Sequence, residues 1–189
     1  MDDESETHTS YLPPYLDFQA FLKKERVNGD HTIETADFIP AGEIKAYLRE
    51  GGRLNEILAA LLEEPEDGHC ANEIIQFYSV VFAILVSIDR GRYITNFLKH
   101  ESLRDNHLPF TVCPPRFPEA IFDEFWHAQP RFCAATFYKG SQQVYDNERR
   151  LPYLEKKRIG EGGSADVYRV RIHCDYNKLH GSGSQVSRR

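Results

Sequence analysis

The sequence predicts a mainly α protein in which a helical domain is followed by a β-hairpin. Two observations predict the helices. Apolar residues recur at helical spacing between residues 53 and 64, and residues 74–88 are apolar nearly all round, as in a buried helix. A third observation predicts the hairpin, because two β-like runs at 154–159 and 167–172 flank a cluster of glycines.

Composition shifts divide the 189 residues into five segments. We expect a disordered tail at 1–14, a helical N-terminal domain at 15–138 and a linker at 139–152. A hairpin is expected at 153–173, and a second disordered tail at 174–189. The linker prediction depends on the polar, charged character of the segment after Tyr138.

The first helices of the domain have recognisable faces and stops. A helix that starts near Tyr15 would bury one face, and a short helix at 43–49 would end at the glycine pair that follows it. The helix at 53–64 carries the clearest stripe, with spacing i, i+3, i+4, i+7 and i+8. The residues that we expect to face the core are Leu16, Ala20 and Phe21; Ile44, Tyr47 and Leu48; and Leu54, Ile57, Leu58, Leu61 and Leu62.

The apolar run at 74–88 has a membrane-spanning helix as its alternative interpretation. A span needs about 20 apolar residues, whereas this run covers only about 22 Å at ~1.5 Å per residue. Glu73 bounds it on one side and Asp89 on the other. We interpret it as the central buried helix of the domain, with Asn72 as its N-cap.

The remainder of the domain is shorter and richer in aromatic residues. We expect a short helix around 93–98, then a helix at 119–127 with Ile121, Phe122, Phe125 and Trp126 facing inward. A strand is expected at 131–138. Helices followed by extended elements would also suit a winged-helix-like arrangement, although a fold analogy of this kind does not give function.

Charge and cysteine content restrict the function classes. The net charge is −6, so nothing general favours a nucleic-acid partner. The acidic, polar start of the chain is no signal peptide. Cys70, Cys113, Cys133 and Cys174 are widely spaced, which favours isolated reduced thiols over a zinc site. These features predict an intracellular protein, cytoplasmic or nuclear, without a membrane partner.

The glycine cluster has the spacing of a phosphate-binding turn. Gly160, Gly162 and Gly163 lie between the two β-like runs, and glycine lets backbone amides approach a ligand with no Cβ in the way. A Rossmann turn would need a helix directly after the glycines, but the residues that follow are β-branched. An ordinary hairpin with a flexible turn is the remaining alternative.

These residues resemble the first two strands and the glycine-rich loop of a eukaryotic-type protein kinase, whose pattern is G-x-G-x-x-G-x-V. Gly160, Gly162 and Val167 match it, and Ala165 stands at the third glycine. The resemblance implies that Ile159 and Val167 cover the adenine of ATP and that the amides around Glu161 to Ser164 cover its phosphates. The implied nucleotide-binding set is Ile159, Gly160, Glu161, Gly162, Gly163, Ser164, Ala165 and Val167.

The resemblance covers only about 20 residues, the front edge of a kinase N-lobe. The sequence lacks a strand with Ala-x-Lys, a His-Arg-Asp and an Asp-Phe-Gly, and Lys178 lies in a polar stretch that predicts a solvated side chain. We therefore expect the N-terminal portion of a protein-kinase-like protein. ATP with Mg²⁺ would serve a full-length form, whereas this chain would be inactive and would bind ATP weakly or not at all.

The helical segment resembles the region ahead of kinase domains in some filamentous-fungal proteins. The residues that carry this similarity are Phe82-Ala83-Ile84-Leu85, Leu108-Pro109-Phe110 and the aromatic residues from Trp126 to Phe137. It implies a regulatory or recruiting domain. The alternative is a non-catalytic module that binds another protein through the helical domain and keeps the hairpin as a remnant.

Overall fold

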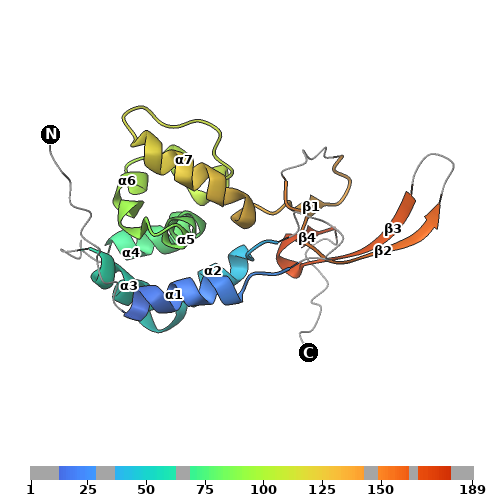
Figure 1. The fold of residues 1–189 in the computed structure, drawn as a ribbon, viewed down its shortest axis with the longest axis horizontal. Helices are drawn as coiled ribbons and strands as arrows, with labels where there is room; N and C mark the ends of the chain where they lie inside the picture. The colour runs from blue at the N-terminus through green and yellow to red at the C-terminus, as the bar shows by residue number, and fades with distance from the viewer. Residues whose placement is uncertain (1–12, 29–36, 63–68, 143–148, 162–165, 180–189) are drawn as a thin grey trace.

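The computed structural model describes residues 13–28, 37–62, 69–142, 149–161 and 166–179. Helices gather at one end of the molecule, and a long hairpin projects from the other (Figure 1). The α-helices are α1 (Pro13–Lys24), α2 (Ala41–Arg49), α3 (Arg53–Leu61), α4 (His69–Glu73), α5 (Ser79–Ser87), α6 (Ile94–Leu98) and α7 (Glu119–Ala128). The strands are β1 (Phe137–Tyr138), β2 (Tyr153–Glu161), β3 (Asp166–Ile172) and β4 (Asn177–Lys178). The predicted mainly α class is confirmed.

Helix α5 is the centre of the helical core, as the sequence predicts. Every residue from Ser79 to Val86 is buried, and α1, α2, α6 and α7 all contact this helix. The stretch Cys70–Ser87 is long and apolar enough to cross a membrane by length and composition alone, but 67% of it is buried inside the protein. We therefore interpret it as a core helix.

The start of this long helix differs from the prediction. Asn72 is no N-cap, because α4 begins at His69 and continues through a π-helical turn, η2 (Ile74–Tyr78), into α5. Tyr78 leaves the helical conformation at φ −132° and ψ 19°. The amides of Val80 and Val81 then donate to a carboxylate from a distant turn, that of Asp105 in η5 (Asp105–His107).

Short 3₁₀ turns link the helices and strands. These are η1 (Glu50–Gly52), η3 (Gly91–Tyr93), η4 (Glu101–Leu103), η6 (Gln129–Phe132) and η7 (Cys174–Tyr176). The predicted glycine stop after α2 is confirmed. Gly51 and Gly52 have φ of 59° and 79°, conformations that residues with a Cβ adopt reluctantly.

Two predicted core faces are wrong in part. Helix α1 buries Tyr15, Phe18 and Leu22, whereas Leu16 is 48% exposed. In α7 the side chain of Trp126 is 40% exposed, because neighbouring Phe125 already takes the inward direction. The i, i+3, i+7 spacing of Tyr15, Phe18 and Leu22 includes two aromatic residues that our assignment of the α1 face left out.

The strand predicted at 131–138 is also wrong except for its end. Helix α7 runs on into η6, and the buried Gln129 side chain bonds both backbone groups of Phe110, at 2.7 Å to the amide and 2.8 Å to the carbonyl. That pair of bonds fixes the helical turn. Only Phe137–Tyr138 is a strand, and it pairs in parallel with β4.

A second, smaller core joins the hairpin to the helices. Phe38, Ala134 and Tyr176 are buried together, and Leu154 and Ile172 from the base of the hairpin pack against them. The tail predicted at 174–189 is therefore wrong for its first residues, which form η7 and β4 because Tyr176 is buried in this core. Residues 180–189 lie outside the described part of the chain, as do residues 1–12 of the tail predicted at 1–14. The last two residues of that predicted tail are instead the first of α1.

Candidate functional site: the projecting hairpin and its base

Strands β2 and β3 pair in antiparallel register, as the sequence predicts. Arg158 pairs with Tyr168 and Gly160 with Val167, so Ile159 is an extra residue in a β-bulge. The bulge places both Ile159 and Gly160 against the single residue Val167. A Cβ added to Gly160 would lie 3.9 Å from the Cβ of Val167, an ordinary contact distance. The described residues would therefore leave room for a side chain at this position.

The predicted nucleotide-binding residues are described only in part. Ile159, Gly160 and Glu161 end β2, and Val167 lies near the start of β3. The turn residues Gly162, Gly163, Ser164 and Ala165 lie outside the described residues. The structure thus brings Ile159, Gly160 and Val167 together at the far end of the hairpin.

Apolar side chains toward the far end of the hairpin are open to solvent. Ile159 is 53% exposed, Val167 52% and Tyr168 42%. In the described part of the chain, β2 and β3 form a sheet of two strands with no third strand beside them. An isolated two-stranded hairpin is marginal in water, so a surface of this kind gains stability when another element covers it.

Charged residues near the tip are paired with one another. The Nε of Arg158 donates to Asp166 at 3.0 Å, and the guanidinium of Arg158 also lies 3.0 Å from Glu161. Further down, the ammonium of Lys156 lies 4.2 Å from the centroid of the Tyr168 ring. The contacts of Arg158 with Asp166 and of Lys156 with Tyr168 join the two strands, whereas Arg158 and Glu161 both belong to β2. Exposed pairs of this type contribute little stability each.

The base of the hairpin is anchored by the residues that follow it. The Tyr176 hydroxyl accepts a hydrogen bond from the amide of Ala41 at 3.3 Å and donates to the carbonyl of Ile39 at 3.4 Å. Burial raises the pKa of Tyr176 to about 12. The carboxylate of Asp175 accepts from the amide of Gly42 at 3.0 Å, in the first turn of α2.

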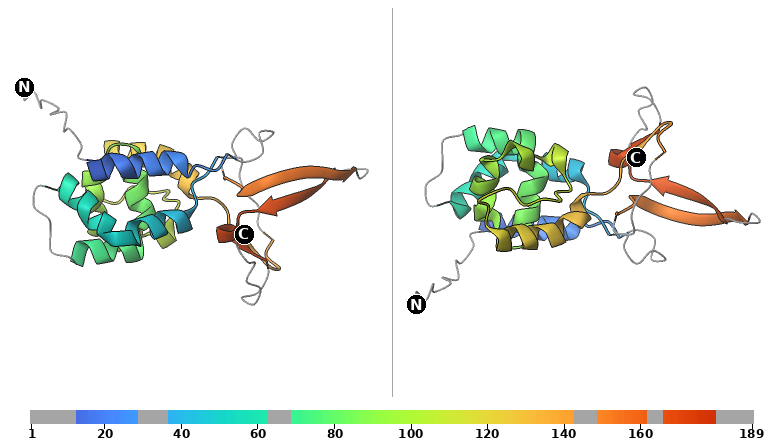
Figure 2. Two further views of the ribbon diagram at one scale, coloured as in Figure 1. Left: turned by 90° about the horizontal axis from the view of Figure 1, so that it is seen from below. Right: turned by 90° about the horizontal axis from the view of Figure 1, so that it is seen from above.

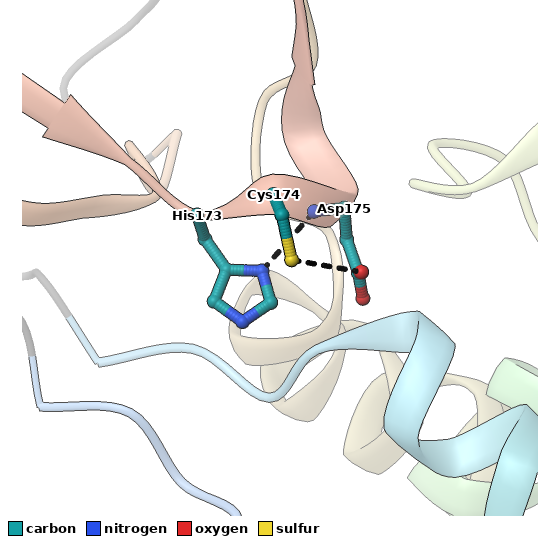
Figure 3. A group of neighbouring side chains, drawn as sticks. All are labelled: His173, Cys174 and Asp175. Atoms are coloured by element: carbon teal, nitrogen blue, oxygen red, sulfur yellow. Dashed lines mark hydrogen bonds between the residues drawn. The ribbon is translucent and has the colours of Figure 1, made fainter. Parts of the chain in front are cut away.

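His173, Cys174 and Asp175 form a compact group at this base (Figure 3). Their nitrogen, sulfur and oxygen atoms lie within 4.8 Å of one another, a donor set that could suit a zinc-like cation. All three side chains already have partners. His173 Nδ1 accepts from the amide of Asp175 at 3.3 Å, Cys174 Sγ donates to Asp175 Oδ1 at 3.7 Å, and the Asp175 carboxylate accepts from the amide of Gly42. We therefore interpret the group as a structural joint. We did not predict it, because we assigned His173 to the hairpin and Cys174 and Asp175 to the tail.

A second feature that we did not predict is a cleft on the helical domain. Its volume is about 530 Å³, and Lys45, Arg104 and Arg149 are among its lining residues. Lys45, Arg104 and Arg149 lie far apart in the sequence, so no local pattern predicts that they share a cleft. Lys178, which we expected to be solvated, is exposed in β4.

Comparison of this chain with protein families, with curated proteins and with solved structures finds no match in any of the three.

Proposed function

We propose that this chain is the N-terminal portion of a protein-kinase-like protein, in which the hairpin covers ATP during phosphoryl transfer to protein serine or threonine. The observation that carries the proposal is the far end of the hairpin. There a bulge sets Ile159 and Gly160 against Val167, with the apolar side chains about half exposed. A nucleotide cover needs apolar groups for the base beside a glycine turn for the phosphates.

The open edges of β2 and β3 support the same proposal. In a kinase-like protein the strand and helix that follow would cover this sheet and would supply a lysine and metal-holding acids. The 189-residue chain contributes none of these catalytic groups, so by itself it binds Mg-ATP too weakly to matter and transfers no phosphate. The helical domain would regulate or recruit, in an intracellular setting.

The test uses the protein translated from the full open reading frame, through and beyond Arg189. Transfer of the γ-phosphate to a generic protein acceptor is measured for that protein and for its Val167→Asp variant. We expect transfer in the parent and a loss of at least tenfold in the variant, because a charge would face the adenine. Val112→Asp is the matched control, since Val112 is 75% exposed and lies outside the hairpin.

Equal activity in the Val167→Asp and Val112→Asp variants would remove the hairpin from the nucleotide site. An absence of transfer in the parent, with a correctly folded protein, would favour the other function class, an interaction module. The open edges of β2 and β3 are the observation that favours an interaction module, because an open edge can pair with a strand from another protein.

A further inference from the structure

A positively charged cleft lies on the helical domain, with Arg149 from the segment before β2 among its lining residues. Residues from α2, η2, η5 and the segment after η6 line it, and its volume of about 530 Å³ lies within the range of small-molecule sites. Lys45, Arg104 and Arg149 bring three positive charges and Asp105 one negative charge among its lining residues. The lining is therefore cationic in a chain whose net charge is −6.

The carboxylate of Asp105 is committed to the fold. Its oxygens accept from the amides of Val80 and Val81, both at 3.0 Å, and Lys45 Nζ lies 3.7 Å away. These contacts hold Lys45 at the cleft. An ammonium has three donors, and the side chain of Lys45 is 37% exposed, so it can also reach a ligand.

Arg104 is held in place by its neighbours, and its side chain is 26% exposed. Its guanidinium carbon lies 4.4 Å from the centroid of the Phe77 ring, and its Nη2 donates to Glu101 at 2.9 Å. Its Nε is buried and has no acceptor in the described part of the chain. An arginine fixed in this way matches a carboxylate or a phosphate with little loss of side-chain freedom on binding.

Apolar side chains form the other part of the wall. Phe77, Leu108 and Phe132 line the same cleft as Lys45 and Arg104. A bare inorganic ion would leave these surfaces wet, whereas a ligand with an apolar body beside its charged group would cover them. The positive charges and the apolar wall therefore favour a ligand that has a negatively charged group beside an apolar body.

We propose that this cleft binds a small organic oxyanion, with its carboxylate or phosphate held by Lys45 and Arg104 and its apolar body against Phe77 and Leu108. Arg149, another lining residue, adds to the positive charge of the cleft. No residue of β2 or β3 lines the cleft, so it is distinct from the nucleotide site that we assign to the hairpin.

The probes are phenyl phosphate, benzoate and inorganic phosphate, titrated calorimetrically into the whole 189-residue chain at low ionic strength. We expect binding of phenyl phosphate or benzoate at least tenfold tighter than that of inorganic phosphate, with the preferred probe telling which oxyanion the site takes. Binding should weaken as salt is added. Arg104→Gln should lower the affinity about tenfold, the usual effect of losing one charge-assisted hydrogen bond.

Arg92→Gln is the matched control, because Arg92 is exposed and does not line the cleft. Arg149→Gln is a second variant, and far-UV circular dichroism establishes that each variant is folded. Failure of all three probes to bind the folded parent would overturn the proposal. So would an equal loss in the Arg92 and Arg104 variants, or unchanged affinity when Arg104 and Arg149 are replaced.

Discussion

Asp105 links two distant segments through one carboxylate. It accepts from the amides of Val80 and Val81 at the point where the π-helical turn ends, and burial raises the pKa of this carboxyl above its usual value. Val80 and Val81 lie in the first turn of α5, directly after Tyr78 leaves the helical conformation, and the first amides of an α-helix have no acceptor within it. Asp105 therefore caps the N-terminus of α5 from a distant turn, a role that usually belongs to the residue directly before the helix.

Replacing Asp105 with Ala should lower the free energy of unfolding by about 1–3 kcal/mol, because two buried amides lose their acceptor. Urea titration monitored by circular dichroism measures the change. The control is Asp123→Ala on the exposed side of α7, which should alter stability by less than about 0.5 kcal/mol. Equal effects of the two changes would show that the capping bonds contribute nothing.

Because Tyr176 is buried, we expect the folded protein to lose stability at alkaline pH. Its pKa is raised by burial to about 12 from an ordinary value of 10.0. Between these values the unfolded chain releases the phenolic proton while the folded protein keeps it, so stability falls as the pH rises from 10 towards 12. The contribution is fully present below pH 10.

Tyr176→Phe removes this proton but keeps the ring in the small core. We expect it to cost about 1 kcal/mol at pH 8, from the lost hydrogen bond to Ile39. The difference in unfolding free energy between parent and variant should then shrink between pH 10 and 12. Curves that stay parallel over this range would show that the Tyr176 hydroxyl is not buried as described.

At the scale of elements, helix α5 organises the domain. Phe82 is fully buried and stacks at 6.0 Å, between ring centroids, on Phe18 of α1. Phe82→Ala should lower the free energy of unfolding by about 3–5 kcal/mol. The same truncation at an exposed position, Val112→Ala, should change it by less than about 0.5 kcal/mol. A loss below ~1 kcal/mol at Phe82 would mean that another helix is the centre of the core.

The sequence predicted those elements whose signal is local. The continuous apolar run predicted α5, the glycine pair predicted the end of α2, and the β-branched runs predicted the hairpin. Other features depend on contacts between segments far apart in the chain. The start of the expected strand lies in η6 instead, where the Gln129 side chain bonds Phe110. Part of the expected tail is ordered because Tyr176 is buried in the small core beside Phe38.

The candidate sites divide in the same way. The hairpin and its glycine pattern could be found from adjacent residues, whereas the pairing of Ile159 and Gly160 with one residue required the register. The cationic cleft gathers Lys45, Arg104 and Arg149 from three parts of the chain, and only the fold places them together.

At the scale of the whole molecule, the hairpin is held firmly at one end only. Leu154 and Ile172 pack into the small core with Tyr176, while the far end extends away from the helical domain in every view (Figures 1 and 2). The segment with Asp175 and Tyr176 returns to α2 and fixes the direction in which the hairpin leaves. A helical domain joined in this manner can present the hairpin to elements that complete its sheet.

The most direct test of the kinase-like account is to sequence the transcript through and beyond the codon for Arg189. The account predicts an open frame that encodes a strand with Ala-x-Lys, then His-Arg-Asp and Asp-Phe-Gly, in that order. A stop codon directly after Arg189 in every transcript, or an open frame without these motifs, would contradict it.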